Sequence, residues 1–404
     1  MTSFDELQKF LRRHLLEDVM PFWMRHAIDR RNGGLFTCIS DEGGIQSREK
    51  FVWSQARALW TFSALHRRVQ PSEEWVAVAD GLYEFLRAHG RDAEGNWVFA
   101  TDEFGATTRR AESIYADAFA MLGLVEYFLA TGKSAALDLA LETGRHVRAR
   151  LDKPGSYPTA PYPIPQGMIA HGEAMGFSLA FCNLGEAADN AEMLAYGHKL
   201  GGQVLDHFVR PDRRVILEYL RADFSTADTP EGRAMVPGHG VESAYFQIFN
   251  FANTDRSDYI ERSCDVIRWC LERGWDHEFG GIRLGLDVEG CEPVFWKHAD
   301  TKLWWPQTEA LPACLIAYEH CGADWCLEWY AKVHEWAFAH YPVRGHGEWT
   351  QRLDRQGRKI NTVVALPVKD PFHLPRALMF ACESLQRLQG RSATIPLSLP
   401  FSPS

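Results

Sequence analysis

Two short stretches each place a histidine three residues before a charged side chain, where a helix is expected to begin. In "VPGHGVESAYFQIFNFAN" (residues 236–253) His239 precedes Glu242, and in "FHLPRAL" (372–378) His373 precedes Arg376. A spacing of three residues puts both members of a pair on one helical face. Imidazole exchanges protons near neutral pH, so two histidines in one site could remove a proton and return it. These four residues therefore predict acid–base chemistry.

Other polar side chains recur near the starts of every second expected helix. They are Lys50, Trp53, Gln55 and Arg57; Tyr115 and Asp117; His171 and Glu173; Gln307 and Glu309; and Glu218 on a connection. Two bases on opposite sides of a substrate carbon can take a proton from one face and deliver one to the other. Arg57 and Arg376 could then stabilise the enediolate oxygen that develops between the two steps.

Other interpretations of these residues remain open. Histidine and glutamate are suitable metal ligands, but no HExxH or comparable chelating spacing is present, so no metal site is predicted. A pair of carboxylates alone would suit glycoside hydrolysis. Arg57 and Glu309 could instead form a buried ion pair, and Trp304 and Trp305 are interpreted as packing. A non-catalytic interaction protein is the third class considered.

The elements that must position these residues are mainly helical. Apolar residues at three- and four-residue spacing predict twelve helices. They begin near Phe4, Ser54, Ser72, Ser113, Ser134, Gly167, Asn190, Val241, Asp258, Trp304, Asp324 and Leu374. Between them, "NGGLFTCISDEGGIQ", "EGNWVFATDEFGA", "FGGIRLGLDVEGC" and "HGEWTQRLDRQGR" alternate apolar and polar residues around a turn, which indicates β-hairpins.

A repeat links the helices and hairpins. Equivalent glycines at 34, 95, 281 and 347 are separated by 61, 186 and 66 residues, which fit a period of about 62 if the long gap counts as three units. Six units of paired helices account for nearly the whole chain, and neither end has a polar capping unit. We therefore predict one all-α domain over residues 1–390, an (α/α)6 barrel with short β-hairpins on the active-site face. Residues 391–404 are predicted to be a surface tail.

Composition excludes several classes of partner. The 404 residues carry a formal net charge of −10 and no basic stripe, which argues against nucleic acid. No uncharged apolar run is long enough to cross a membrane, and the first 20 residues lack the apolar centre of a signal peptide. The nine cysteines are scattered and lack zinc-site spacing, so we interpret them as buried free thiols in a reducing cytoplasm.

The motifs resemble those of the N-acylglucosamine 2-epimerase family. The resemblance rests on "GGLFTCISDEGG", "KFVWSQARALW", "SIYADAFAMLGLVEYFLATG", "GHGVESAY", "KLWWPQTEAL" and "FHLPRAL", which occur in order between about residues 20 and 388. The resemblance implies an (α/α)6 barrel and a cofactor-independent proton transfer at C2 of an opened aldose, through a cis-enediolate.

The resemblance also implies roles for individual residues. His239 and His373 match the acid/base histidines, and Arg57 matches an arginine that contacts a substrate oxygen. The predicted catalytic residues are His239, His373, Arg57 and Glu242. The predicted substrate-binding residues are Trp53, Tyr115, His171, Glu218, Glu309 and Arg376.

Two departures from the family pattern leave the substrate open. His171 resembles a third histidine of the cellobiose epimerase and isomerase branches, yet "AHGEAMG" lacks their His-x-x-Glu spacing, and "FWKHADTKLWW" differs from the acylamino-sugar enzymes. We predict a monosaccharide of the N-acylglucosamine/N-acylmannosamine type. Epimerisation or aldose–ketose isomerisation of an unmodified hexose (mannose, fructose or glucose) is the alternative. No cofactor is predicted, and a homodimer is left open.

Overall fold

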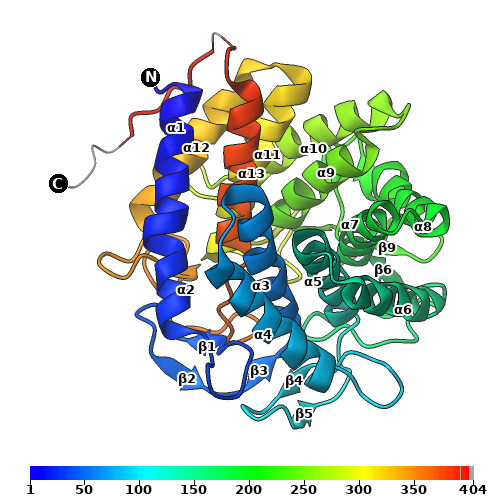
Figure 1. Cartoon of the computed structure of the whole chain (residues 1–404). Coiled ribbons are helices and arrows are strands. Elements are labelled where there is room, and N and C mark those ends of the chain that lie inside the picture. Colours follow the sequence, from blue (N-terminus) through cyan, green and yellow to red (C-terminus); the bar gives the residue numbers. More distant parts are fainter. Residues whose placement is uncertain (392, 400–404) are drawn as a thin grey trace.

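The computed structural model describes residues 1–391 and 393–399, and over this range twelve helices form two concentric rings. The predicted (α/α)6 barrel is confirmed. The inner helices are α3 (Val52–Ala64), α5 (Tyr115–Thr131), α7 (His171–Ala187), α9 (Pro237–Phe251), α11 (Trp304–Cys321) and α13 (His373–Leu388). Each inner helix packs against the next one along the chain (Figure 1).

The outer ring begins with one long helix made of α1 (Phe4–Arg13), a π-helical turn over His14–Val19 and α2 (Met20–His26). The other outer helices are α4 (Glu73–His89), α6 (Ser134–Leu151), α8 (Ala191–Gln203), α10 (Ser257–Gly274) and α12 (Asp324–His340). Further π-helical turns extend α3 over Leu65–Val69 and α8 over Val204–Phe208.

The distribution of apolar residues around each helix determines whether it lies in the inner or the outer ring. The inner helix α5 is buried almost all round from Ala116 to Tyr127, whereas α10 buries one stripe and leaves charged residues outside. A helix that is apolar on every side must be covered on every side, which only the inner ring provides. Gly123 shows how close this packing is, because a Cβ there would lie 2.4 Å from the carbonyl oxygen of Ala56 in α3.

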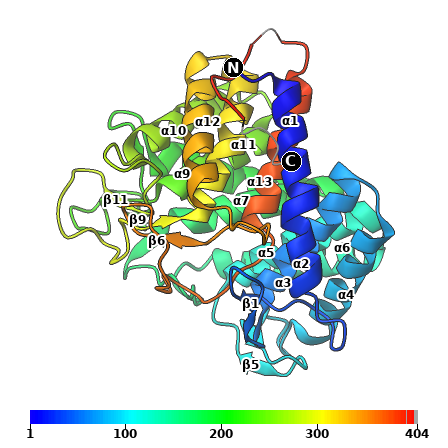
Figure 2. The ribbon, with the colours of Figure 1, turned by 90° about the vertical axis from the view of Figure 1, so that its left-hand side faces the viewer.

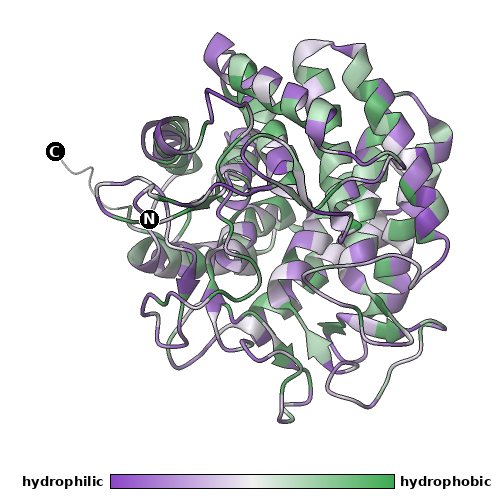
Figure 3. Ribbon diagram, turned by 90° about the horizontal axis from the view of Figure 1, so that it is seen from below, coloured by the Kyte–Doolittle hydropathy of each residue, from purple (hydrophilic) through white to green (hydrophobic). Residues whose placement is uncertain are grey.

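Short strands gather at the end of the barrel where the inner helices begin, shown at the bottom of Figure 1 and face-on in Figure 3. Four strands lead straight into inner helices: β3 (Lys50–Phe51), β6 (Met168–Ala170), β10 (Ala234–Met235) and β12 (Lys302–Leu303). The others are β1 (Cys38–Ile39), β2 (Ile45–Ser47), β4 (Ala100–Thr101), β5 (Thr107–Arg109), β7 (Val209–Arg210), β8 (Val215–Ile216), β9 (Tyr219–Arg221), β11 (Leu286–Asp287) and β13 (Arg352–Leu353).

Antiparallel pairing ties these connections to the helix starts. β1 pairs with β2, β7 with β8, β4 with both β3 and β5, and β6 with β9. The third and fourth predicted hairpins supply β11 and β13, which pair with β10 and β12, the strands that enter α9 and α11. The pairings of β3, β6, β10 and β12 therefore fix the first turn of an inner helix against the connection beside it.

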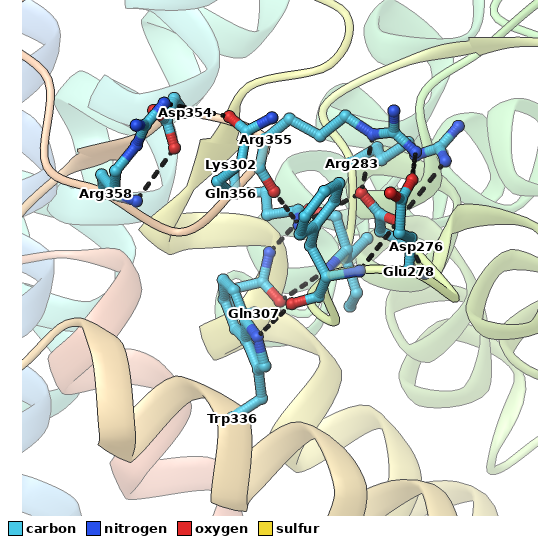
Figure 4. Close-up of polar contacts among 12 residues, drawn as sticks. Asp276, Glu278, Arg283, Lys302, Gln307, Trp336, Asp354, Arg355, Gln356 and Arg358 are labelled. Carbon is cyan, nitrogen blue, oxygen red and sulfur yellow. Dashed lines mark hydrogen bonds and ion pairs between the residues drawn. The ribbon is translucent and has the colours of Figure 1, made fainter.

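Polar residues just inside α3 and α11 anchor the connections. The side-chain amide of Gln307 accepts a hydrogen bond from the N–H of Ile282 (2.9 Å) and donates one to its carbonyl oxygen (2.7 Å), and Gln55 does the same with Leu35 (2.7 and 2.8 Å). Lys302 lies 3.2 Å from Asp276, beside Arg355 (Figure 4). The sequence grouped Gln55 and Gln307 with the reactive residues. This prediction is corrected, because both side chains form hydrogen bonds with the backbone of a connection.

Two other residues grouped with the site also have structural partners. Lys50 lies 2.8 Å from Asp29 in an arrangement equivalent to that of Lys302 and Asp276, and its amine also contacts the carbonyl oxygen of Gly33. Asp117 forms an ion pair of 3.0 Å with Arg150. The side chains of Lys50 and Asp117 therefore have structural roles in the barrel.

The described part of the tail returns to the N-terminus. Thr2 and Ile395 form an antiparallel bridge, and the Thr2 hydroxyl donates a hydrogen bond of 2.6 Å to the carbonyl oxygen of Leu397. The side chains of Ile395 and Leu397 are buried, so this segment packs against the barrel (Figure 2). Among residues 1–391 and 393–399, none of the helices has the length and apolar character to span a membrane.

Candidate active site

His239 occupies the first turn of α9 and is held by a carboxylate from a neighbouring strand. Its Nδ1 lies 3.1 and 3.2 Å from the two carboxylate oxygens of Glu218. Glu218 directly precedes β9, and its own carbonyl oxygen accepts a hydrogen bond from the N–H of His171 (2.8 Å). A carboxylate can only accept, so Nδ1 of His239 carries the hydrogen and Nε2 is left for a substrate.

Glu218 and His239 each stabilise the charged form of the other. Burial opposes ionisation of Glu218, but His239 and the hydrogen bonds from His171 and His239 lower its pKa to about 2. Burial likewise opposes a charge on His239, yet the Glu218 carboxylate outweighs it, so the pKa of His239 is raised. The His239 side chain is 27% exposed, which gives this histidine access to solvent protons.

His171 and Tyr115 complete this side of the site. His171 is buried, with Nδ1 3.6 Å from Glu218 and no hydrogen-bond partner at Nε2 among the described residues. A Cβ built on Gly172 would lie 3.5 Å from the Tyr115 hydroxyl, 3.7 Å from Glu218 and 3.9 Å from His239. The side chains of Tyr115, Glu218 and His239 therefore converge over Gly172, the second residue of α7.

His373 is held in a second carboxylate cluster, between α11 and α13. Its Nδ1 lies 2.7 Å from Glu309, whose other oxygen accepts a hydrogen bond from the Tyr245 hydroxyl (2.5 Å). Arg376 binds Glu309 at 2.7 Å and also binds Glu242. Glu242 therefore supports Arg376, although in the sequence it stands beside His239.

The two histidines have opposite electrostatic environments. Burial and the nearby Arg57 lower the pKa of His373 to about 3, so its imidazole is neutral near pH 7. Ligand atoms of Glu242, Glu309 and His373 lie within 4.8 Å of one another, a spacing suitable for a metal ion. Arg376 already forms ion pairs with both carboxylates, however, so a fixed cation occupies the position that a metal ion would need.

Trp305 links the two histidines, and its role was missed from the sequence. Its ring centroid lies 5.2 Å from that of His239 and 5.7 Å from that of His373. Gly238 makes this position possible, because a Cβ there would lie 2.5 Å from the indole ring. The interpretation of Trp305 as packing is therefore corrected. Trp304 also lies beside His373, with ring centroids 5.9 Å apart. No local pattern shows that Trp305 contacts both histidines, since this depends on the packing of α9, α11 and α13.

Arg57 lies beside His373 on a platform of aromatic rings. Its guanidinium carbon is 4.0 Å from the centroid of Phe119, 5.1 Å from Phe372 and 5.2 Å from Trp53. One ion pair, of 3.3 Å, joins Arg57 to Asp370, and this replaces the ion pair with Glu309 that the sequence left open. Sequence reasoning missed Asp370, which stands three residues before His373 with nothing to mark it.

Two buried nitrogens beside this platform have unused hydrogen-bonding capacity. Within residues 1–391 and 393–399, Nε of Arg57 and Nε1 of Trp53 have no hydrogen-bond partner. Buried donors are normally paired, so unpaired ones in a site are suited to ligand oxygens. All ten predicted site residues thus lie in one continuous group, with Trp305, Tyr245 and Asp370 added by the structure.

Comparisons with known proteins agree with this fold. The family model for N-acylglucosamine 2-epimerase matches residues 34–377. N-acylglucosamine 2-epimerase of Rattus norvegicus is 28% identical over 411 residues, which cover 96% of this chain and 94% of the relative. Cellobiose 2-epimerase of Dictyoglomus turgidum is 25% identical over 359 residues, with 84% and 89% covered.

A solved structure supports the architecture independently of close sequence similarity. Cellobiose 2-epimerase from Spirochaeta thermophila superposes with a TM-score of 0.81 at 20% identity, covering 95% of this chain and 98% of that one. At this identity the likeness concerns the fold. The match of the family model across most of the sequence shows more: the chain belongs to the N-acylglucosamine 2-epimerase family and is an isomerase of the sugar 2-epimerase type.

Proposed function

We propose that the protein interconverts a free aldose with its C2 epimer, with substrates of the N-acylglucosamine and N-acylmannosamine type, by proton transfer between two histidines. The observation that carries this proposal is the matched pair of carboxylate-held imidazoles, His239 with Glu218 and His373 with Glu309, on either side of Trp305. Each pair orients one imidazole and leaves its Nε2 free for the reacting carbon.

The protonation states suggest which histidine acts first. His373 is neutral near pH 7 and is suited to take the proton from C2, while the raised pKa of His239 keeps a proton available for the opposite face. Removing the C2 proton leaves a cis-enediolate, and addition of the His239 proton gives the epimer. One proton leaves carbon and one returns, so the reaction needs no redox partner. Solvent then restores both histidines through the exposed His239.

The two arginines differ in how free they are to meet substrate. Arg376 binds Glu242 and Glu309, so we assign it the positioning of the Glu309 carboxylate that holds His373. Among the described residues Nε is unpaired in both arginines, but Arg57 forms one ion pair and Arg376 forms two, so we assign Arg57 the stabilisation of the enediolate oxygen. The unpaired Nε1 of Trp53 is a further donor for a sugar oxygen.

The substrate class follows the relatives with the greater identity. The rat N-acylglucosamine enzyme is 28% identical across nearly the whole chain, against 25% for the cellobiose enzyme of Dictyoglomus turgidum. Isomerisation of an unmodified hexose uses the same enediolate and differs in returning the proton to C1. The placement of the returned proton therefore distinguishes these two reactions.

Deuterium incorporation tests the proposed reaction directly. The protein is incubated in D₂O separately with N-acetylmannosamine, mannose, glucose, fructose and cellobiose, and products are identified by NMR. We expect N-acetylmannosamine to give its C2 epimer with deuterium at C2. Formation of a ketose from mannose or glucose, without exchange in N-acetylmannosamine, would refute the proposed epimerase and indicate an isomerase.

Single substitutions test the two-histidine mechanism. Asparagine preserves a hydrogen-bond donor near the Nδ1 position but cannot carry a proton to carbon, so His239→Asn and His373→Asn should each lower turnover by about 10²- to 10⁴-fold. The exposed His346 provides a matched control, and His346→Asn should retain full activity. Circular dichroism checks that each variant is folded. Near-normal turnover in a folded variant at either position would exclude the two-base mechanism.

A further inference from the structure

Three cysteines from three helices meet at the end of the barrel opposite the proposed active site. Cys321 is the last residue of α11, Cys326 lies in the first turn of α12, and Cys264 lies in α10. The sulfur atoms of Cys321 and Cys326 are 3.6 Å apart, and Cys264 is a second hydrogen-bonding neighbour of Cys321. The sequence placed these thiols in different helices and predicted buried free thiols, which is wrong for Cys321 because its side chain is exposed.

The connection between α11 and α12 produces this meeting. Gly322 ends α11 with a φ of +62°, a left-handed conformation that costs glycine little, and α12 begins at Asp324. So short a link folds the first turn of α12 back beside the last turn of α11. Cys321 is exposed, whereas Cys264 and Cys326 are buried beneath it.

The three thiols differ in their tendency to ionise. Hydrogen bonds from Cys264 and Cys326, and one from the backbone N–H of Ala323, lower the pKa of Cys321. The hydrogen bond to Cys321 and burial raise the pKa of Cys326, which therefore keeps its proton. A thiolate is the nucleophilic form of cysteine, and redox-sensitive cysteines combine exposure with a neighbouring thiol.

We propose that Cys321 and Cys326 form a reversible disulfide when the protein meets a hydroperoxide. The Cys321 thiolate attacks the terminal peroxide oxygen, and the O–O bond breaks to give a sulfenic acid and an alkoxide, which is hydroxide when the oxidant is hydrogen peroxide. The Cys326 thiol then attacks the sulfenic sulfur, an S–S bond forms, and the sulfenic oxygen leaves as water with the proton from Cys326. The peroxide accepts the two electrons that the two thiols lose, and an added dithiol returns them.

The geometry fits this pairing. The two sulfurs must approach from 3.6 Å to a bond length of about 2.05 Å, and both residues lie at helix ends next to a glycine-containing link. The modification site is also separate from the proposed catalytic groups. Trp305 and Glu309 lie at the start of α11 and Cys321 at its end, so replacing Cys321 should leave basal turnover unchanged.

Mass spectrometry after brief oxidation tests the proposal. Hydrogen peroxide is added at a small molar excess to the full-length protein, free thiols are alkylated, and the chain is cleaved before aspartate residues. Cleavage before Asp324 separates Cys321 from Cys326, so their disulfide appears as two linked peptides, 300–323 and 324–353. Fragmentation distinguishes Cys321 from Cys314 within the first peptide. We expect this link to form, and to disappear after dithiothreitol treatment.

Cys291 is the matched control because it is also exposed. At pH 6.5, iodoacetamide should alkylate Cys321 about tenfold faster than Cys291, because the thiolate is the reactive form and hydrogen bonds from two neighbouring thiols favour it at Cys321. Cys326→Ala should leave a sulfenic acid on Cys321 that dimedone captures, and Cys321→Ser should abolish both products. A link between Cys264 and Cys321, or oxidation of Cys291 as fast as Cys321, would overturn the proposal.

Discussion

At the scale of single residues, the site shows how two histidines acquire different properties from similar partners. Each donates a hydrogen bond from Nδ1 to a carboxylate, yet the pKa of His239 is raised and that of His373 falls to about 3. Glu309 also binds Arg376 and Tyr245, so its negative charge does little to raise the pKa of His373. The nearby Arg57 lowers that pKa. Glu218 instead contacts two histidines, His171 and His239, and no arginine or lysine among the described residues is paired with it.

This difference predicts the pH dependence of turnover. In the reactive enzyme one of the two histidines is protonated on both ring nitrogens and the other is neutral. This state is lost when pH rises through the raised pKa of His239. Forward and reverse reactions should share this alkaline limb, because both need a single proton on the pair and differ only in which histidine holds it. Initial rates of C2 exchange between pH 5 and 9, measured from each epimer, test this.

Glu218→Gln provides the decisive comparison for the alkaline limb. Without the anionic partner, His239 should lose its proton at lower pH, so the limb should move down by about one pH unit or more. An alkaline limb that stays in place in this variant would show that another group controls it.

At the scale of elements, the barrel positions its chemistry through strand-to-helix junctions. β10 ends three residues before Gly238 of α9, and β9 follows Glu218 directly, so pairing within the connections sets the distance between a histidine and its carboxylate. Gln55 and Gln307 repeat one tether at equivalent positions in the sequence repeat. The tethers hold the connections against the first turns that carry the site.

Removal of one tether should destabilise the fold. Gln307→Ala leaves the buried N–H and carbonyl oxygen of Ile282 without partners, which should lower the free energy of unfolding by about 2 to 4 kcal/mol. The exposed Gln356, near the same connection, is the control, and Gln356→Ala should change it by less than about 0.5 kcal/mol. Urea unfolding measures both variants, and equal losses would contradict the tether.

At the scale of the whole molecule, the ring is closed between α3 and α13. Ser54 donates a hydrogen bond to Asp370 (2.9 Å), Thr61 donates one to the carbonyl oxygen of Pro371 (2.6 Å), and Trp60 packs edge-on against Phe372. The outer helix α1 covers α13 along this seam (Figure 1). The same closure brings Arg57 beside His373, so the site exists only when the ring is complete.

Closure also buries a histidine that should make the protein sensitive to acid. His334 of α12 is packed against Phe10 and Phe338, and burial, with a smaller contribution from His14, lowers its pKa to about 3. Its unfolded value is near 6.5, so between those values the unfolded chain binds the extra proton and stability falls as pH falls. We expect His334 to account for roughly 2 kcal/mol of lost stability between pH 7 and pH 5.

The variant His334→Leu isolates this effect. Leucine also changes the packing, so the free energy of unfolding of this variant at pH 7 does not by itself report the proton taken up by His334. The fall from pH 7 to pH 5 should be smaller than in the native sequence by roughly 2 kcal/mol, as measured by urea unfolding at each pH. Parallel stability curves for the two proteins would show that His334 takes up no proton on unfolding.

Much of this architecture follows from the sequence alone. The twelve helix starts, the repeat of about 62 residues and the absence of capping units predicted the closed barrel, because helical periodicity and repeats are local properties of the chain. The same repeat predicted that His239 and His373 would lie at one end of the inner ring. Their i, i+3 neighbours were placed correctly on the same helical faces.

Tertiary structure alone decided which of these residues touch. Glu242 follows His239 in sequence but binds Arg376, while His239 binds Glu218 from a strand and His373 binds Glu309 from α11. Tertiary structure also decided the inward position of Trp305, the use of Gln55 and Gln307 as tethers and the contact between Cys321 and Cys326. Spacing along a helix fixes direction, whereas a contact between helices depends on distances of a few ångströms that are set when all six units pack together.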